Sequence, residues 1–384
     1  MMAVWLILLA VGVIFVGLLV LYKSGRMDNL PTWTGFSFKS DEKVLVADEF
    51  HQGEELRHTV SHEPQPGKTL WDWLQLLIIP VVLAVVVFSF NAGQESMNQK
   101  LEQQREQEQL VDAYLDRMSN LLLAGNLYDS QPKAPVRAMA QAITLMTLER
   151  LDPDHKRIVI FFLYRADLIV YHFDYLNKEP GRLDKDKPII TLPLADLEGA
   201  KLNGLYLGSV DLHNMHLSGA DLHSDWLEQA DLGVSIADHV DLSNASMKAA
   251  NLYNADLREA NLQDTQLPEA NMIGAFLAGA QLSRADLSRA NLAVYTTSHG
   301  KFYTQLDNAV LDHVNLSKAL LTGANLTNAD LTGANLTNAD LTGANLTNAD
   351  LTGANLYHAK VSSAQLAEAQ SLAGAILPDG TRHS

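Results

Sequence analysis

The sequence predicts an α + β-solenoid: transmembrane helices near the N-terminus, a short helical region, and a long domain of stacked repeats. Two observations carry this prediction. Two segments are apolar over about 20 residues, the length that spans a bilayer core. In the second half of the chain an apolar residue falls on almost every fifth position, a period that fits neither a helix nor an ordinary strand.

Composition excludes several classes of function. The chain has 384 residues and no cysteine, so disulfides, cysteine metal sites and thiol chemistry are excluded. Its formal net charge of −17 argues against direct nucleic-acid binding, because such binding needs a basic face. There is no phosphate loop, no G-x-S-x-G and no recognisable metal-ligand set. The sequence therefore predicts no enzyme: no catalytic residue, no cofactor and no metal.

Residues 1–22 and 70–91 are each predicted to form a transmembrane helix. The first carries no charge over positions 3–22 and lacks the basic start and small-residue cleavage site of a signal peptide, which favours an uncleaved anchor. The second begins with Trp71 and Trp73, which suit the headgroup level, and is apolar from 76 to 90. The lipid bilayer is therefore an expected partner, and the expected location is the cell membrane, with two spans.

Residues 23–69 contain Gly, Pro and mixed charge without clear periodicity, which predicts a linker loop. Basic residues near the membrane are slightly more numerous before the second span (Lys23, Arg26, Arg57 and Lys68) than after it (Lys100 and Arg105). By the positive-inside rule this favours a C-terminal part outside the cytoplasm. The margin is small, and the side of the membrane stays open.

Residues 92–176 are predicted to form a helical juxtamembrane region, followed by a polar connector at 177–189. Positions 94–124 are rich in helix formers and have apolar residues near a 3.5-residue spacing. A homo-oligomer through this helix is one alternative, and intramolecular packing is the favoured one. Further helices are expected over 135–151 and after Asp152, a natural N-cap followed by Pro153.

Residues 190–384 are predicted to form the repeat domain. Each five-residue unit has an apolar centre and a small residue two positions earlier, which we expect to point inward. One buried leucine contributes about 1.5–3 kcal/mol, whereas fixing five backbones costs roughly 5–10 kcal/mol, so the units must stack. The decapeptide LTGANLTNAD occurs three times in 321–350, as expected where coils contact only their neighbours. The expected inward centres include Leu252, Leu257, Leu262, Leu282, Leu287, Leu326, Leu331, Leu336, Leu341 and Leu346.

The segments ADLSRANL (285–292) and GANLTNADL (323–331) follow the pattern A-(D/N)-L-x-x, which resembles the pentapeptide-repeat family. That resemblance implies a right-handed quadrilateral parallel β-helix in which four pentapeptides form one square coil. About 32 pentapeptides would give roughly eight coils and a rod of ~40 Å at the usual strand spacing. The part before the repeats is also similar to membrane-anchored members that are common in cyanobacteria.

The pattern breaks at residues 293–310 (AVYTTSHGKFYTQLDNAV), where we expect a loop that bulges from the rod. Loops on rigid scaffolds often carry function. One alternative is a partner-binding loop and the other is a tolerated insertion. The residues expected to contact a partner are Tyr295, His299, Lys301, Phe302 and Tyr303.

These expectations favour a membrane-tethered scaffold that presents a rigid rod to an unknown protein partner. The alternative is an acidic nucleic-acid mimic that binds a topoisomerase-like protein, because some soluble members of the resembled family have the shape and charge of duplex DNA. A mimic needs an acidic stripe that is continuous along the rod. The Thr- and Asn-rich coils of 321–350 are nearly neutral outside, which favours the scaffold.

Overall fold

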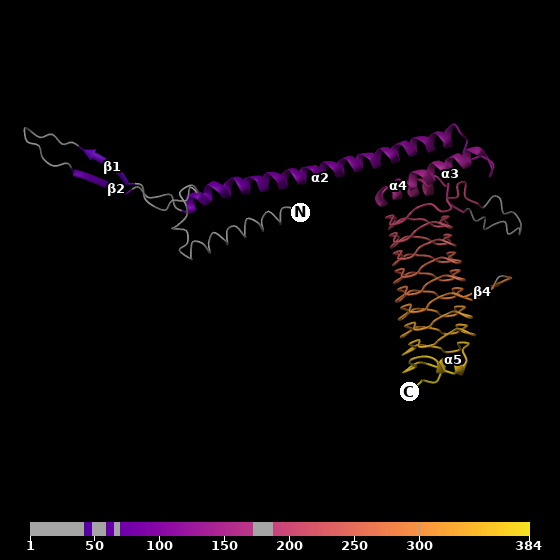
Figure 1. The fold of residues 1–384 in the computed structure, drawn as a ribbon. Coiled ribbons are helices and arrows are strands. Elements are labelled where there is room, and N and C mark those ends of the chain that lie inside the picture. The colour runs from indigo at the N-terminus through magenta and orange to yellow at the C-terminus, as the bar shows by residue number, and fades with distance from the viewer. Residues whose placement is uncertain (1–41, 48–58, 65–69, 172–186, 299) are drawn as a thin grey trace, which may run out of the picture. The chain divides into compact units, whose positions relative to one another are not determined.

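The computed structural model describes residues 42–47, 59–64, 70–171, 187–298 and 300–384. The chain divides into two compact units, Met1–Gln103 and Gln104–Ser384 (Figure 1). The predicted first span, 1–22, lies outside the described residues, as does most of the connector.

The first unit contains a strand pair in the segment predicted to be a linker. Strand β1 (Glu42–Ala47) pairs antiparallel with β2 (Thr59–Pro64), with Glu42 opposite Pro64. The linker prediction missed this pair because it looked for a periodicity over the whole of 23–69. The short run around Val44 and Val46 is β-branched, which favours a strand even without a longer pattern.

Helix α2 (Leu70–Leu123) is one uninterrupted helix, whereas a span at 70–91 and a separate region from 92 were predicted. The helix continues through both Pro80 and Gly93. A glycine inside a helix costs only about 1 kcal/mol, so Gly93 does not break it. Within the described residues, the stretch Pro80–Leu123 is the one helical segment long and apolar enough to cross a membrane. Near the N-terminal end of this stretch the apolar side chains are exposed, among them Val82, Val86 and Phe90.

In the second unit, the C-terminal part of α2 packs against α3 (Pro135–Leu148) and α4 (Pro153–Arg165). Val111, Tyr114 and Met118 are buried in this cluster. The Tyr114 hydroxyl lies 3.1 Å from Thr144 Oγ1, and its ring meets Phe162 edge-on. From Val111 onward, the apolar positions that suggested a coiled coil are therefore used for packing within the chain.

Helix α4 begins as the sequence predicts. Asp152 is its N-cap and accepts a hydrogen bond from the backbone N–H of His155 at 2.9 Å, and Pro153 occupies the first turn. Burial raises the pKa of Asp152, but hydrogen bonds from the His155 backbone N–H and imidazole, together with the Asp154 backbone N–H, outweigh it, so the pKa is lowered overall. The Asp152 side chain therefore fixes the point where the chain turns into α4.

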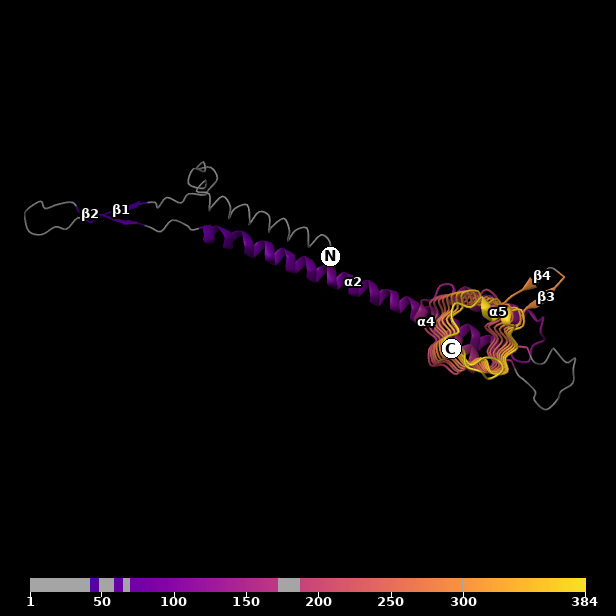
Figure 2. The same cartoon turned by 90° about the horizontal axis from the view of Figure 1, so that it is seen from below.

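The repeat domain is a stack of coils, each hydrogen-bonded in parallel to the next at an offset of twenty residues. Asp330 bridges Asp350, for example, and the Leu331 N–H donates to the Asp350 carbonyl at 2.8 Å. Figure 2 shows the coils lying over one another around one axis. All ten predicted leucine centres have no exposed surface and lie in the buried core of the stack.

Each pentapeptide ends in a tight corner that requires a left-handed backbone. In the unit centred on Leu331, the Ala334 N–H donates to the Leu331 carbonyl at 3.0 Å, and Gly333 between them has φ of +67°. Asn338 has φ of +60° at the equivalent corner five residues later. Glycine and asparagine adopt this conformation most readily, which explains the alternation of Gly and Asn in the decapeptide.

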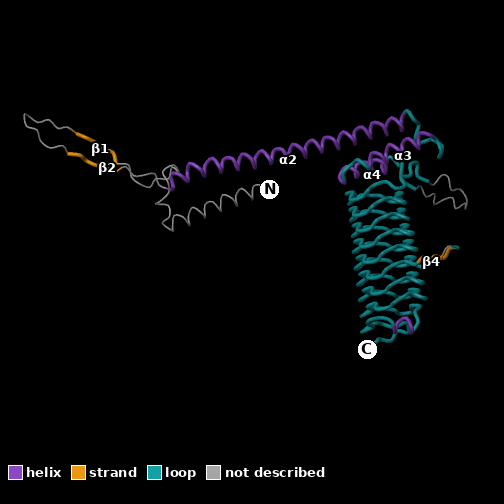
Figure 3. Tube along the Cα trace, in the orientation of Figure 1, coloured by secondary structure: helices purple, strands orange, loops and turns teal. Residues whose placement is uncertain are grey.

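Both ends of the stack are covered. At the first coil, the Lys201 N–H donates to the Pro153 carbonyl of α4, and Val170 bridges Val210 in an antiparallel sense. At the last coil, helix α5 (Ser363–Ala367) interrupts the repeat, and Gln365 Nε2 donates to the carbonyls of Leu341 and Ala344 at 2.7 and 2.8 Å (Figure 3). Covering the terminal coils occupies backbone groups that would otherwise form open sheet edges.

We expect Leu331→Lys to unfold the repeat domain, because it places an ammonium group in a fully buried leucine column. Asn338→Lys is the matched control: it adds the same charge at an exposed corner, and Lys318 already adopts that corner conformation with φ of +61°. Urea unfolding followed by circular dichroism measures both. A fully stable Leu331→Lys protein would contradict the inward assignment.

Candidate interaction surface

The insertion in the repeat domain is a short hairpin. Strand β3 (Tyr295–Thr297) pairs antiparallel with β4 (Gly300–Phe302). Across it, the offset between bridged coils rises from twenty to twenty-nine residues, since Phe276 bridges Gln305. The coil resumes at Thr304 and Leu306, both buried, so the predicted boundary at 310 is wrong. Thr304 occupies the position usually held by alanine, which hid the first unit after the hairpin from the sequence pattern.

The hairpin exposes aromatic side chains. Tyr295, Phe302 and Tyr303 are 40%, 43% and 40% exposed. Tyr295 and Phe302 are directly paired across the two strands, and the Tyr295 ring meets that of Tyr253 edge-on at 5.8 Å. Lys301 is exposed opposite Thr296. His299, the remaining predicted contact residue, lies outside the described residues.

The base of the hairpin is seated on two corner glycines. A Cβ at Gly323 would lie 3.1 Å from Val294 Cβ and 3.4 Å from Tyr303 Cδ1. A Cβ at Gly274 would lie 3.8 Å from Phe302 Cβ. The buried Thr304 hydroxyl joins the coil below by accepting from the Gly274 N–H and donating to the Met272 carbonyl, both at 3.1 Å. The hairpin thus leaves the rod at a fixed point, between coils that approach it closely.

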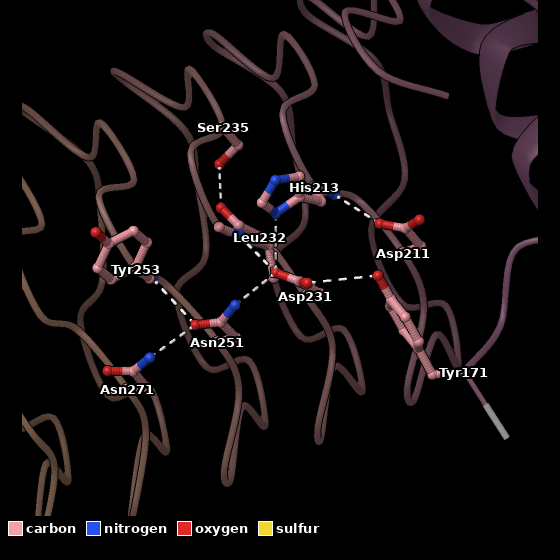
Figure 4. Close-up of polar contacts among 10 residues, drawn as sticks. Tyr171, Asp211, His213, Asp231, Leu232, Ser235, Asn251, Tyr253 and Asn271 are labelled. Atoms are coloured by element: carbon pink, nitrogen blue, oxygen red, sulfur yellow. Dashed lines mark hydrogen bonds and ion pairs between the residues drawn. The ribbon is translucent and has the colours of Figure 1, made fainter. Parts of the chain in front are cut away.

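A polar ladder runs along the coils N-terminal to the hairpin (Figure 4). It follows the bridged column of Asp231, Asn251, Asn271 and Asn291, and the hairpin begins a few residues after Asn291. Asn271 Nδ2 donates to Asn251 Oδ1 at 2.9 Å, and Asn251 Nδ2 donates to Asp231 Oδ1 at 2.8 Å. Asp231 Oδ1 also accepts from the Gly233 N–H at 2.8 Å. Each side-chain amide of the ladder therefore donates to the side-chain oxygen on the preceding coil. The outer side of the ladder faces solvent.

The N-terminal end of the ladder contains two carboxylates and a tyrosine. The Tyr171 hydroxyl lies 3.5 Å from Asp231 Oδ2, and His213 Nδ1 lies 3.5 Å from Asp231 Oδ1. Burial raises the pKa of Asp211, and burial together with both carboxylates raises the pKa of Tyr171. A tyrosine held protonated beside two carboxylates is a hydrogen-bond donor, and this arrangement supplies no activated nucleophile.

Among the described residues, one group has the composition of a metal site: Asp221, His223 and Asp241, whose ligand atoms lie within 4.8 Å of one another. The sequence did not single out this set. Its atoms already serve the fold, because Asp221 Oδ1 lies 2.6 Å from His223 Nδ1 and Asp241 Oδ1 accepts from the Ser243 N–H and from Asn261 Nδ2. These contacts account for the cluster as part of the coil-to-coil ladder.

One carboxylate points into the stack instead of outward. Asp225 occupies an alanine position and is 1% exposed. Its Oδ1 accepts from the Leu205 N–H at 2.7 Å, while Oδ2 has no hydrogen-bond partner among the residues that the structure describes. Burial raises the pKa of Asp225 to about 8, an effect that Arg157 and the backbone N–H partly oppose. A charged group in the leucine core is disfavoured, so this side chain is neutral below that pH.

Comparisons with known proteins identify the family. A sequence model described as pentapeptide repeats matches in eight copies, which fall over 195–293 and 304–369 on either side of the hairpin. The pentapeptide repeat protein HetL from the cyanobacterium Nostoc sp. strain PCC 7120, involved in heterocyst differentiation regulation, is 35% identical; the match covers 58% of this chain and 98% of HetL, with a TM-score of 0.38. The chain belongs to the pentapeptide-repeat family.

Two further solved structures are similar over part of the chain. Rfr23, a pentapeptide repeat protein from the cyanobacterium Cyanothece 51142, is 32% identical over 32% of this chain and 64% of Rfr23, with a TM-score of 0.18. QnrB1, a plasmid-mediated fluoroquinolone resistance protein, is 17% identical over 46% of this chain and 92% of QnrB1, with a TM-score of 0.20. No curated protein matches the chain.

Sequence reasoning identified the hairpin aromatics but missed the residues that position them. Tyr253, Gly274 and Gly323 lie 20 to 50 residues from the hairpin in sequence and reach it only because coils stack. Counting back in two steps of twenty from Ala293, the first residue of the predicted insertion, would have placed Tyr253 two coils below its start. Asp225 could have been found as the one acidic residue at a small-residue position.

We expect Gly323→Ala to destabilise the protein more than Gly343→Ala. Both glycines have φ of +71°, so both substitutions cost about 1–2 kcal/mol from backbone strain. A Cβ at Gly323 also meets Val294 and Tyr303, whereas one at Gly343 has no atom within 4 Å. The extra cost, about 1 kcal/mol, should appear in urea unfolding together with faster proteolysis in 294–303. Equal costs would show that the hairpin base is not seated on Gly323.

We expect Asp225 to make the protein less stable as pH rises. Unfolded, its carboxyl titrates near pH 4; folded, its pKa is about 8. Between these values the folded state holds a proton that the unfolded state has released, so the Asp225 contribution to the unfolding free energy falls by about 1.4 kcal/mol per pH unit. Urea unfolding of wild type and Asp225→Asn from pH 4.5 to 8.5 measures this. Parallel pH profiles would contradict it.

Proposed function

We propose that this pentapeptide-repeat protein is a non-catalytic scaffold that is tethered to the membrane through α2 and binds a protein partner through the β3–β4 hairpin. The observation that carries the proposal is the hairpin itself. It is the place in the described repeat coils where extra residues leave the rod, and it presents Tyr295, Phe302 and Tyr303 to solvent. Tyrosine and other aromatics are enriched in the energetic centres of protein interfaces.

A right-handed quadrilateral β-helix, the fold expected of the family, suits this role. Its coils are held by backbone ladders and by buried leucine columns, so a loop inserted at a corner leaves the stack intact. The seating of the hairpin on Gly274 and Gly323 supports a fixed presentation of the aromatic side chains. Preorganisation of this kind reduces the entropy lost on binding.

Membrane tethering is supported by the exposed apolar surface of α2. Val82, Val86 and Phe90 are each more than half exposed, and no side chain of the most apolar window of the helix is buried. Such a surface is unfavourable in water and favourable in lipid. The proposal has two further parts: a second span at 1–22, and the side of the membrane on which the repeats lie.

The acidic-mimic alternative has less support in the described coils. A mimic needs a continuous negative stripe, but Arg258, Arg284, Arg289 and Lys360 each form an ion pair with a carboxylate of the repeat domain. These four basic residues lie on several coils and interrupt the negative surface. The scaffold is therefore the function we adopt.

Affinity purification of the full-length protein from detergent-solubilised membranes tests the partner-binding claim. We expect one protein to co-purify with wild type and with Tyr357→Ser, a control that removes a 42%-exposed aromatic from the C-terminal coils. The same protein should be lost with Phe302→Ser, which removes a 43%-exposed aromatic from the hairpin. Recovery of the same proteins with all three would contradict binding through the hairpin.

Alkaline carbonate extraction tests the tether. The full-length protein should stay in the membrane pellet, and a variant with Val82, Val86 and Phe90 changed to Ser should move toward the soluble fraction. Wild-type protein extracted by carbonate would contradict an integral anchor. Protease added to intact cells then reports the side on which the repeat domain lies.

A further inference from the structure

The hairpin stands at a corner and is followed directly by another face of the rod. We define the Phe276 face as the segments 236–239, 256–259, 276–279 and 305–308, which come from four successive coils. Parallel bridges connect Ile236 to Asp256, Asp256 to Phe276, and Phe276 to Gln305. Because Gln305 follows Thr304 at the base of the hairpin, this face begins where the hairpin ends.

Two large apolar side chains lie exposed on the Phe276 face. Ile236 and Phe276 are 42% and 43% exposed, and one coil, carrying Asp256, separates them. Coils stacked at ~4.8 Å place the two side chains ~10 Å apart along the rod. Two turns of an α-helix rise ~10.8 Å, so positions i and i+7 of a helix lying along the rod match this spacing.

The same face is acidic. Its four segments carry Asp238, Asp256, Glu259 and Asp307, and one basic residue, Arg258. Arg258 Nε donates to Asp256 Oδ1 at 2.7 Å, so Asp256 is the carboxylate that this guanidinium neutralises. Glu259 is two-thirds exposed, and its Oε2 lies 3.4 Å from His239 Nδ1. Among the described residues, no Lys or Arg forms an ion pair with Asp238, Glu259 or Asp307, and these carboxylates flank the apolar column.

The opposite face shows that this combination is particular to one side. The opposite face lies ten residues away along each coil of twenty. It carries both signs of charge, and its segments are 226–229, 246–249, 266–269 and 286–289. Arg289 lies 3.6 Å from Glu269, and Lys248 lies on the coil after Glu228. Trp226 is 45% exposed there, close to the exposure of Phe276, so the opposite face provides an apolar control without the acidic rim.

We propose that the Phe276 face binds a basic amphipathic helix of a partner protein. Apolar residues at i and i+7 contact Ile236 and Phe276, and Lys or Arg residues beside them meet Asp238, Glu259 and Asp307. This is the helix-docking mode in which one apolar stripe is read at i, i+3, i+4 and i+7. The proposal rests on the protein-binding function above and adds the chemistry of the partner and a second contact surface.

The test uses the full-length protein in phosphatidylcholine nanodiscs and a fluorescent 18-residue peptide of lysine and leucine. Its leucines follow the i, i+3, i+4, i+7 pattern; a second peptide has the same composition with scrambled leucines. We expect the patterned peptide to bind, by anisotropy after subtraction of empty nanodiscs, at least tenfold more tightly than the scrambled one. Equal affinities would overturn the proposal.

Variants locate the site. Ile236→Ser with Phe276→Ser should weaken binding about tenfold, and Glu259→Gln with Asp307→Asn should reduce both the affinity and its dependence on salt. Trp226→Ser and Glu228→Gln on the opposite face should change neither. Binding that responds equally to changes on both faces would overturn the proposal in favour of general attraction to an acidic protein.

Two further outcomes separate this inference from its basis. If Phe302→Ser in the hairpin removes the cellular partner while Ile236→Ser with Phe276→Ser does not, the proposed function stands and the Phe276 face falls. If sedimentation without peptide shows a dimer that Phe276→Ser dissociates, the face is an interface between two copies of this chain, and the basic helix is excluded. The proposal is supported if the protein is a monomer and if both pairs of substitutions on the Phe276 face, apolar and acidic, weaken peptide binding.

Discussion

The repeat domain depends on one constraint: no coil can satisfy its own backbone. In each unit the residue before the centre donates to the coil below, while the centre itself donates to the coil above; Asp330 donates to Ala309, and Leu331 donates to Asp350. A single coil would leave these groups unpaired next to an apolar core, which is costly. Stability therefore comes from neighbours, and the chain needs a long run of similar units and an ending at each side.

This constraint explains the parts of the second unit that are not repeats. The segment around Val170 and helix α4 supply partners to the first coil, and near the other end Gln365 of α5 donates to two carbonyls of the coil that begins at Leu341. The hairpin is compatible with the stack because both of its ends lie at a corner, where the ladder is already turning. The nine extra residues do not interrupt the column that contains Phe276. Phe276 bridges Gln305 on the next coil, just as it would bridge the residue twenty positions later without the insertion.

Much of the repeat domain could be predicted, because a period of five identifies both the corner and the inward side chain. The leucine centres, from Leu252 to Leu346, required only that regularity. The hairpin was located by the loss of the pattern, but its end was misplaced because Thr304 fills an alanine position while Leu306 is already a buried centre. The seat of the hairpin on Gly274 and Gly323 and the contact of Tyr253 with Tyr295 depend on stacking between distant units, which a local pattern does not reveal. The pairing of β1 with β2 was missed for a related reason, since each strand is too short to show a period by itself.

Hydrogen–deuterium exchange on the full-length protein tests the central claim, a rigid stack that carries a protruding hairpin, most directly. In most units of 305–360 the amides of the leucine centre, of the residue before it and of the corner residue donate to neighbouring coils, so these amides should exchange slowly and to a similar extent through the identical decapeptides. Amides of 296–298, 300 and 301 should exchange much faster, while the Gln305 amide at the junction, which donates to the Ala275 carbonyl, stays protected. Rapid exchange throughout 321–350 would contradict a stack held by coil-to-coil ladders, and protection of the hairpin equal to that of the coils would contradict its role as an exposed binding element.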